Sequence, residues 1–164
     1  MNNPIIKLFE AVQSISYRCR NPSPIELSLG LTYANCSQKR DLLKQELNKI
    51  GFKVRELDAI FDWRDLPIPQ EITRLLKESG TLQKHHLLGL EIEGQDLKVD
   101  PTWDLSLELF GFPVTKSWNG YEDTKQVTDG KIIYYDPSLQ RISLPYFLEE
   151  RKIFAIEFNK WIGR

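Results

Sequence analysis

Apolar side chains recur at helical spacing near both ends of this chain. At the N-terminal end they predict an amphipathic helix from about Pro4 to Ser14. Its buried face would consist of Ile5, Leu8, Phe9 and Val12. Near the C-terminal end, a second apolar stripe predicts a helix docked against the rest of the protein. This stripe consists of Phe147, Phe154, Phe158 and Trp161.

The best-defined helix lies between these two. Asn35 is a good N-cap, and Gln38 stands where a capping side chain reaches back to the cap residue. The pattern predicts a helix from Cys36 to Gly51, where glycine is a natural C-terminal cap. Its buried stripe would consist of Leu43, Leu47 and Ile50, and Cys36 shares that stripe.

Two shorter helices are expected on either side of a strand. Ser23 followed by Pro24 and Glu26 is a capping-box start, which predicts a helix ending near Gly30. Residues 52–61 alternate as a strand does, and two prolines fix the loop over residues 62–69. Residues 69–79 then predict a helix that stops at Gly80. Its inward positions would be Ile72, Leu75 and Leu76.

The later part of the chain is strand-like. Residues 82–92 and 96–100 are typical of a hairpin that turns at Glu93-Gly94. A second turn signal at Asp129-Gly130 precedes a strand over residues 131–135. Helices followed by an antiparallel sheet indicate an α+β fold, and a length of 164 residues favours one domain over residues 1–164.

Composition narrows the range of functions. The net charge is −1 and the sequence pI is about 6.2, which argues against nonspecific binding to nucleic acids or anionic membranes. No apolar run approaches the length of a membrane span, and the N-terminus lacks the pattern of a signal peptide. We therefore expect a cytoplasmic protein with Cys19 and Cys36 as free thiols.

Cys36 is the first candidate for chemistry. As the first residue of its helix it would lie beside unpaired backbone N–H groups and the positive end of the helix dipole. Both features favour the thiolate, and the same N–H groups could bind a developing oxyanion. The competing interpretation is that Cys36 is a buried core residue, because it shares the stripe of Leu43 and Leu47.

The hairpin supplies a base and its orienting carboxylate. If Glu93-Gly94 is a two-residue turn, Leu87 pairs with Asp100, and His85 is the diagonal neighbour of Asp100 on the same face. His86 then points to the other face, although a register slip of one residue would exchange the two histidines. The competing interpretation is an ordinary His–Asp hydrogen bond without a catalytic role.

Other combinations of residues give weaker predictions of a functional site. His85, His86 and Asp104 could form a metal site only if both histidines shared a face, which an intact strand prevents. Cys19 is interpreted as a bystander, with redox pairing to Cys36 as the alternative. The four tryptophans are interpreted as packing residues, and no glycine loop of the phosphate-binding type occurs. No cofactor and no metal is therefore predicted.

Residues 35–103 resemble the transglutaminase-like superfamily of papain-like cysteine enzymes. Three features carry this resemblance: a cysteine that opens a helix, a histidine on a following strand, and a hairpin leading to an Asp-Pro-Thr-Trp-Asp run. In this chain they are Cys36 followed by Gly51-Phe52-Lys53-Val54-Arg55, then His85, then Val99-Asp100-Pro101-Thr102-Trp103-Asp104. The chain departs from the family at Ala34, where glycine is common, and at Leu87, where an aromatic residue is common.

The resemblance implies a papain-like arrangement, in which the helix bearing Cys36 packs on an antiparallel sheet bearing His85 and Asp100. It also implies a Cys-His-Asp triad for thiol-dependent acyl transfer at amide bonds of a protein or peptide substrate. The family's oxyanion side chain has no motif here, and Tyr17 and Tyr33 are the candidates.

Water as acyl acceptor would give a cysteine peptidase or amidase, which small relatives favour, whereas an amine would give a cross-linking transglutaminase. A non-catalytic binding or scaffold domain is the alternative outside the enzymes. Because the chain is small, a partner protein or an oligomer could complete the site.

Overall fold

The computed structural model describes residues 3–20, 25, 28–29 and 33–164. Its main sheet has four antiparallel strands in the order β5-β4-β3-β6. These strands are β3 (Val54–Asp62), β4 (Leu82–Ile92), β5 (Gln95–Val99) and β6 (Ile133–Tyr135). A second, two-stranded parallel sheet consists of β1 (Ser16–Tyr17) and β2 (Tyr33–Ala34). The α+β class predicted from the sequence is therefore confirmed.

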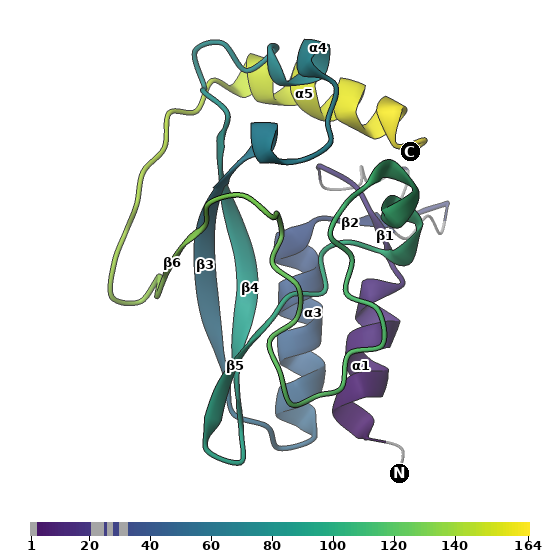
Figure 1. The fold of residues 1–164 in the computed structure, drawn as a ribbon, viewed down its shortest axis with the longest axis vertical. Helices are drawn as coiled ribbons and strands as arrows, with labels where there is room; N and C mark the ends of the chain where they lie inside the picture. The colour runs from purple at the N-terminus through teal and green to yellow at the C-terminus, as the bar shows by residue number, and fades with distance from the viewer. Residues whose placement is uncertain (1–2, 21–24, 26–27, 30–32) are drawn as a thin grey trace.

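Helices lie beside the sheet and across one of its ends (Figure 1). Helices α1 (Pro4–Gln13) and α3 (Cys36–Lys49) lie side by side, and α3 packs on β4. Helix α5 (Leu148–Trp161) lies with α4 (Gln70–Thr73) at the opposite end of the sheet from the β4–β5 turn. Two short 3₁₀ helices, η1 (Trp63–Asp65) and η2 (Leu105–Phe110), lie in the connections.

Two large apolar clusters, with a smaller one around Leu57, Ala59 and Leu87, lie between the described elements. One joins α1, α3 and the β4–β5 hairpin, with Phe9, Leu43, Leu47 and Leu88 among its buried members. The other lies under α5 and consists largely of aromatic side chains, including Trp63, Trp103, Phe112, Phe154 and Phe158. The buried positions of Trp63, Trp103 and Trp118 confirm the interpretation of these tryptophans as packing residues.

Several details differ from the sequence predictions. Ile50 is predicted to be buried but is 45% exposed, because α3 ends at Lys49 and Ile50 lies beyond its last helical residue. The helix predicted over residues 69–79 is regular only from Gln70 to Thr73, although Ile72 and Leu76 are buried as expected. Phe147 is 51% exposed, because it precedes the first turn of α5. The helix predicted from Ser23 to Gly30 lies mostly outside the described residues.

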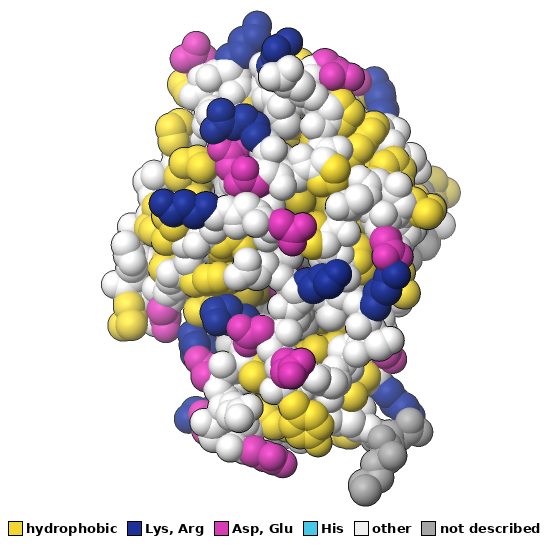
Figure 2. Space-filling view, viewed as in Figure 1, with side chains coloured by type: hydrophobic (Ala, Val, Ile, Leu, Met, Phe, Trp, Pro, Cys, Tyr) yellow, Lys and Arg dark blue, Asp and Glu magenta, His cyan; other side chains and the backbone are white. Residues whose placement is uncertain are grey.

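Charged and apolar side chains are interspersed over the face of the molecule seen in Figure 2. Basic and acidic side chains lie next to one another on this face, as expected for a net charge of −1. Within the described residues, no helix combines the length and the apolar character needed to cross a membrane.

Candidate active site

Cys36 is the first residue of α3, as predicted. The Asn35 side chain accepts a hydrogen bond from the Gln38 backbone N–H at 3.0 Å, and the Gln38 side chain accepts one from the Asn35 N–H at 3.0 Å. This reciprocal capping box fixes the point at which the helix begins. The N–H groups of Cys36 and Ser37 are in the first turn and have no intrahelical acceptor. Cys36 is a half-buried free thiol on this first turn.

His85 and Asp100 are brought together by the hairpin. Leu88 pairs with Val99 and Ile92 with Gln95, which confirms the register expected for a two-residue turn. Both turn residues have positive φ, 49° at Glu93 and 81° at Gly94, as this tight turn requires. The His85 Nε2 lies 2.6 Å from the Asp100 Oδ2. His85 is 3% exposed and Asp100 is 8% exposed, so the contact is shielded from water.

The Asp100 carboxylate is itself held in place. Its Oδ1 accepts a hydrogen bond from the Thr102 backbone N–H at 3.0 Å, and the Asp100 N–H donates to the Thr124 hydroxyl at 2.9 Å. Burial alone would raise the pKa of Asp100, but the charge and the hydrogen bond of His85 outweigh it, and the pKa lies below the ordinary carboxyl value. The Asp100 carboxylate therefore faces the imidazole in its ionised form.

The Cys36 thiol and His85 line the same cleft, and the thiol lies close enough to contribute to the pKa of His85. Because Nε2 faces Asp100, the nitrogen that remains for the thiol is Nδ1. Burial would lower the pKa of His85, but the charge of Asp100, its hydrogen bond and the thiol contact raise the pKa above the ordinary histidine value. The imidazole thus contacts the carboxylate directly and has the thiol as a neighbour.

A cleft of about 490 Å³ opens onto the thiol and the imidazole. Its lining includes Cys36 and His85, together with an apolar wall under α5. This wall includes Phe61, Trp63, Trp103, Phe154, Ala155 and Ile156. The ring of Phe61 packs edge-on against His85, with centroids 5.9 Å apart, which restricts the imidazole. A substrate in the cleft would therefore have the thiol on one side and an apolar surface on another.

Tyr17 and Cys19 also line the cleft. The register of β1 and β2 places Tyr17 opposite Ala34, two residues before Cys36. Burial, together with the neighbouring thiols, raises the pKa of Tyr17 well above its ordinary value, so its hydroxyl remains a hydrogen-bond donor. Burial raises the pKa of Cys19 to about 12, which keeps this thiol protonated. Tyr33, the other oxyanion candidate, packs its ring against Arg18 at 5.2 Å.

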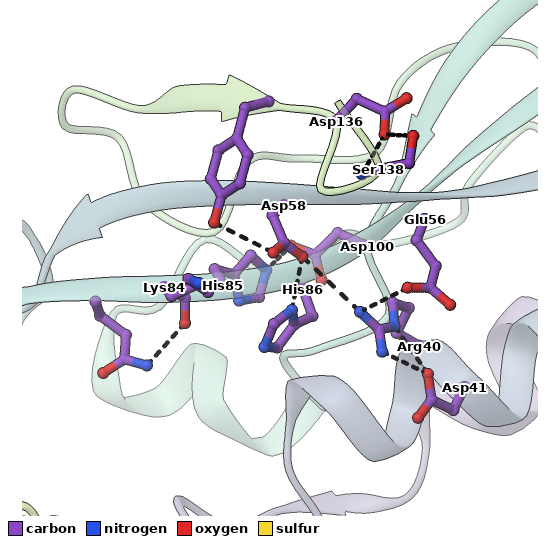
Figure 3. A network of polar contacts seen from close by, with 12 residues as sticks. Arg40, Asp41, Glu56, Asp58, Lys84, His85, His86, Asp100, Asp136 and Ser138 are labelled. Atoms are coloured by element: carbon purple, nitrogen blue, oxygen red, sulfur yellow. Dashed lines mark hydrogen bonds and ion pairs between the residues drawn. The ribbon is translucent and has the colours of Figure 1, made fainter. Parts of the chain in front are cut away.

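His86 forms a second histidine–carboxylate pair, which the sequence did not predict. Its Nδ1 lies 2.7 Å from the Asp58 Oδ1, while Tyr135 donates to the Asp58 Oδ2 at 3.2 Å. Arg40 reaches the same carboxylate at 3.8 Å (Figure 3). The pair depends on the register in which Asp58 of β3 lies opposite His86 of β4, and no local motif signals that register.

Lys39 is a second feature that the sequence did not predict. Its side chain is fully buried, and its Nζ donates to the carbonyl oxygens of Gln13, Pro101 and Thr102 at 3.0, 3.3 and 2.9 Å. Three acceptors match the three N–H donors of an ammonium group. Lys39 thus ties the helix of Cys36 to the segment that follows Asp100. The only signal in the sequence is its place on the stripe of Leu43 and Leu47.

The alternative metal site is not assembled. His85 faces Asp100, His86 faces Asp58, and Asp104 binds the Arg164 guanidinium at 3.0 Å. Within the part of the chain that the structure describes, no group of three or more His, Cys, Asp or Glu residues could hold a metal ion. The described geometry therefore leaves Cys36, His85 and Asp100 as the candidate reactive group.

Searches against protein-family models, curated proteins and solved structures found no significant match to this chain. The case for a function therefore depends on the geometry around Cys36 and on the order of the residues that build it.

Proposed function

We propose that this protein is a cysteine hydrolase of transglutaminase-like type with a papain-like arrangement, acting as a peptidase or amidase through Cys36, His85 and Asp100. One observation carries the proposal: the buried Nε2–Oδ2 contact of 2.6 Å between His85 and Asp100, on an imidazole that shares a cleft with the thiol at the start of α3. A nucleophile, a base and an orienting group in hydrogen-bonded sequence are the requirement for acyl transfer through cysteine.

In the first step, the Nδ1 of His85 takes the thiol proton, and the Cys36 sulfur attacks the carbonyl carbon of the amide. The pair with Asp100 stabilises the imidazolium that results. As the C–N bond breaks, the same imidazolium returns its proton to the leaving amine, and a thioester remains on Cys36. Asp100 stays ionised throughout and holds the ring in one orientation.

The negative charge that develops on the carbonyl oxygen needs donors near the thiol. The backbone N–H of Cys36 supports this role, because it lies at the positive end of α3 and has no intrahelical acceptor. The Tyr17 hydroxyl is the second donor we assign, because it lines the same cleft and burial keeps it protonated. Tyr17 therefore takes precedence over Tyr33 as the oxyanion side chain.

In the second step, an acceptor cleaves the thioester. Water activated by His85 gives a carboxylic acid and regenerates the thiol. A primary amine would instead give a new amide, which is the cross-linking alternative. The size of the cleft, about 490 Å³, and its apolar wall suit a side chain of a peptide next to the scissile bond.

An activity-based thiol probe combined with a peptide library tests the proposal. We expect the probe to modify Cys36, and we expect the library to be cleaved at amide bonds by the unmodified protein but not by Cys36→Ala. Adding a primary amine such as cadaverine separates the two acceptors, because incorporation of the amine would identify a cross-linking enzyme. A Cys36 that resists the probe, in a folded protein that cleaves nothing, would point to a non-catalytic scaffold.

A further inference from the structure

A second hollow adjoins the cleft of the candidate site. It has a volume of about 640 Å³ and lies between the start of β4 and the connection from β6 to α5. The two hollows share part of their lining, namely Gln83, Lys84, His86, Tyr146 and Arg151. We call the second hollow the β4 groove. A substrate that fills the cleft at Cys36 can therefore extend into the β4 groove.

The described lining of the β4 groove is basic. It contains Lys84, Arg141 and Arg151, and its only acidic residue within the described part of the chain is Asp58. The Asp58 carboxylate is already engaged by His86, by the Tyr135 hydroxyl and by Arg40. Figure 3 shows His86 and Arg40 both directed at Asp58. The groove thus carries an excess of positive charge in a chain whose net charge is −1.

Within the described residues, these three cationic groups form no direct ion pair, although the charge of Glu150 acts on Arg151. Arg151 donates to the Gln83 amide oxygen at 3.0 Å and to backbone carbonyl oxygens, all of which are neutral acceptors. Among the described residues, neither Lys84 nor Arg141 forms an ion pair. Two cationic groups are therefore available to a ligand, and Arg151 adds to the positive potential around them.

We propose that the β4 groove is a binding subsite for a carboxylate group of the substrate, contacted by Lys84 and Arg141. This inference rests on the proposed function, and it narrows the substrate to peptides or amides that carry a negative charge near the scissile bond. Two sources supply that charge: the free C-terminus of a peptide, or an acidic side chain. An ion pair in a partly exposed groove gives a modest gain in affinity, about fivefold for one contact.

Binding tests the subsite without requiring turnover. Four pools of random hexapeptides are passed over immobilised Cys36→Ala protein: with one glutamate or with glutamine in its place, each as the free acid or as the C-terminal amide. We expect retention of acidic peptides to exceed retention of the uncharged pool at least fivefold. Preference for the free acid identifies a C-terminal carboxylate, and preference for glutamate identifies a side chain.

Charge variants then locate the contact. In the Cys36→Ala background, Lys84→Gln and Arg141→Gln should each reduce the preference about fivefold, while Lys84→Arg should retain most of it because the charge remains. Lys7→Gln is the matched control, since Lys7 is exposed on α1 and lines neither hollow. Equal retention of charged and uncharged pools, or a preference that survives both glutamine variants, would overturn the subsite.

Turnover separates this inference from the proposed function. If acidic peptides are bound through Lys84 and Arg141 but no amide is cleaved by the unmodified protein, the subsite stands and the proposed hydrolase does not. If amides are cleaved through Cys36 with no dependence on substrate charge, the hydrolase stands and the subsite is wrong.

Discussion

At the scale of single residues, the two adjacent histidines have different partners and therefore different expected roles. His85 is paired with Asp100 and has the Cys36 thiol as a neighbour, whereas His86 is paired with Asp58. Both pairs are close, at 2.6 and 2.7 Å, so distance to a carboxylate does not distinguish them. The neighbouring thiol does distinguish them, and for this reason our proposal makes His85 the base.

Substitution of the histidines tests this assignment. His85→Ala should abolish amide cleavage because the thiol loses its base, and Asp100→Asn should lower it strongly because the imidazole loses its ionised partner. His86→Ala should leave cleavage largely intact and lower the free energy of unfolding by about 1 kcal/mol. The turnover of the three variants measures amide cleavage, and their melting temperatures show whether each variant is folded. An inactive His86→Ala beside an active His85→Ala, both folded, would contradict the assignment.

The two thiols should also differ in reactivity. Burial raises the pKa of Cys19 to about 12, and its neighbour Tyr17 lowers that value only in part. At neutral pH we therefore expect iodoacetamide to modify Cys36 and to spare Cys19. Mass spectrometry of the alkylated protein measures both sites, with Cys36→Ser as the blank and Cys19→Ala as the control. Equal rates at the two sites would show that the surroundings of Cys36 confer no special reactivity.

At the scale of secondary-structure elements, Lys39 connects three parts of the chain. Its ammonium group joins α3 to the last residue of α1 and to the segment after Asp100. Burial lowers the pKa of Lys39 to about 7, although the charges of Asp104 and Asp100 oppose this shift. Lys39 thus holds the segment after Asp100 against the helix that begins at Cys36.

This shift makes stability depend on pH in a definite direction. Between pH 7 and about 10.4 the unfolded chain keeps the Lys39 proton while the folded protein releases it, so folding gains free energy as pH rises. The advantage of the wild type over Lys39→Met, measured by urea unfolding, should therefore grow from pH 7 to pH 10, by at most about 1.4 kcal/mol per pH unit. The comparison with Lys39→Met removes the contributions of other titrating groups. If the difference in unfolding free energy between the wild type and Lys39→Met stayed constant or shrank as pH rises, the lowered pKa of Lys39 would be contradicted.

At the scale of the whole molecule, α5 closes the aromatic core and is tied down at its C-terminal end. Arg164 donates to both oxygens of Asp104 at 3.0 and 3.1 Å, and Asp104 also accepts from the Tyr17 backbone N–H at 2.7 Å. The Asn159 side chain accepts from the Cys19 N–H at 2.9 Å. The wall of the cleft under α5 is therefore coupled to the strand that carries Tyr17.

A double-mutant cycle measures this connection. Arg164→Met leaves the buried Asp104 carboxylate without its cation and should lower the free energy of unfolding by about 3 kcal/mol. Asp104→Asn with Arg164→Met should cost less than the sum of the two single changes, because no unpaired charge remains. Urea denaturation of the wild type, both single variants and the double variant gives the coupling. If the costs of the two single changes are additive in the double variant, the Arg164–Asp104 pair contributes little to the free energy of unfolding.

Local sequence determined the parts of the site that depend on short-range geometry. The capping box of Asn35 and Gln38 fixes where α3 begins, so Cys36 could be placed at its first turn from the sequence. The turn at Glu93-Gly94 fixes the register of β4 and β5, and alternation along the strand then selects His85 over His86 as the neighbour of Asp100. Both inferences use contacts between residues that are close along the chain.

Tertiary structure alone decided the remaining contacts. The thiol meets the imidazole only because α3 packs on β4, and Asp58 meets His86 only through the register of β3 and β4. The burial of Lys39 depends on three carbonyl groups, two of which lie more than sixty residues away along the chain. Periodicity marks which face of an element is buried but does not say what that face will contact, because packing partners are chosen by the shapes and charges of distant segments.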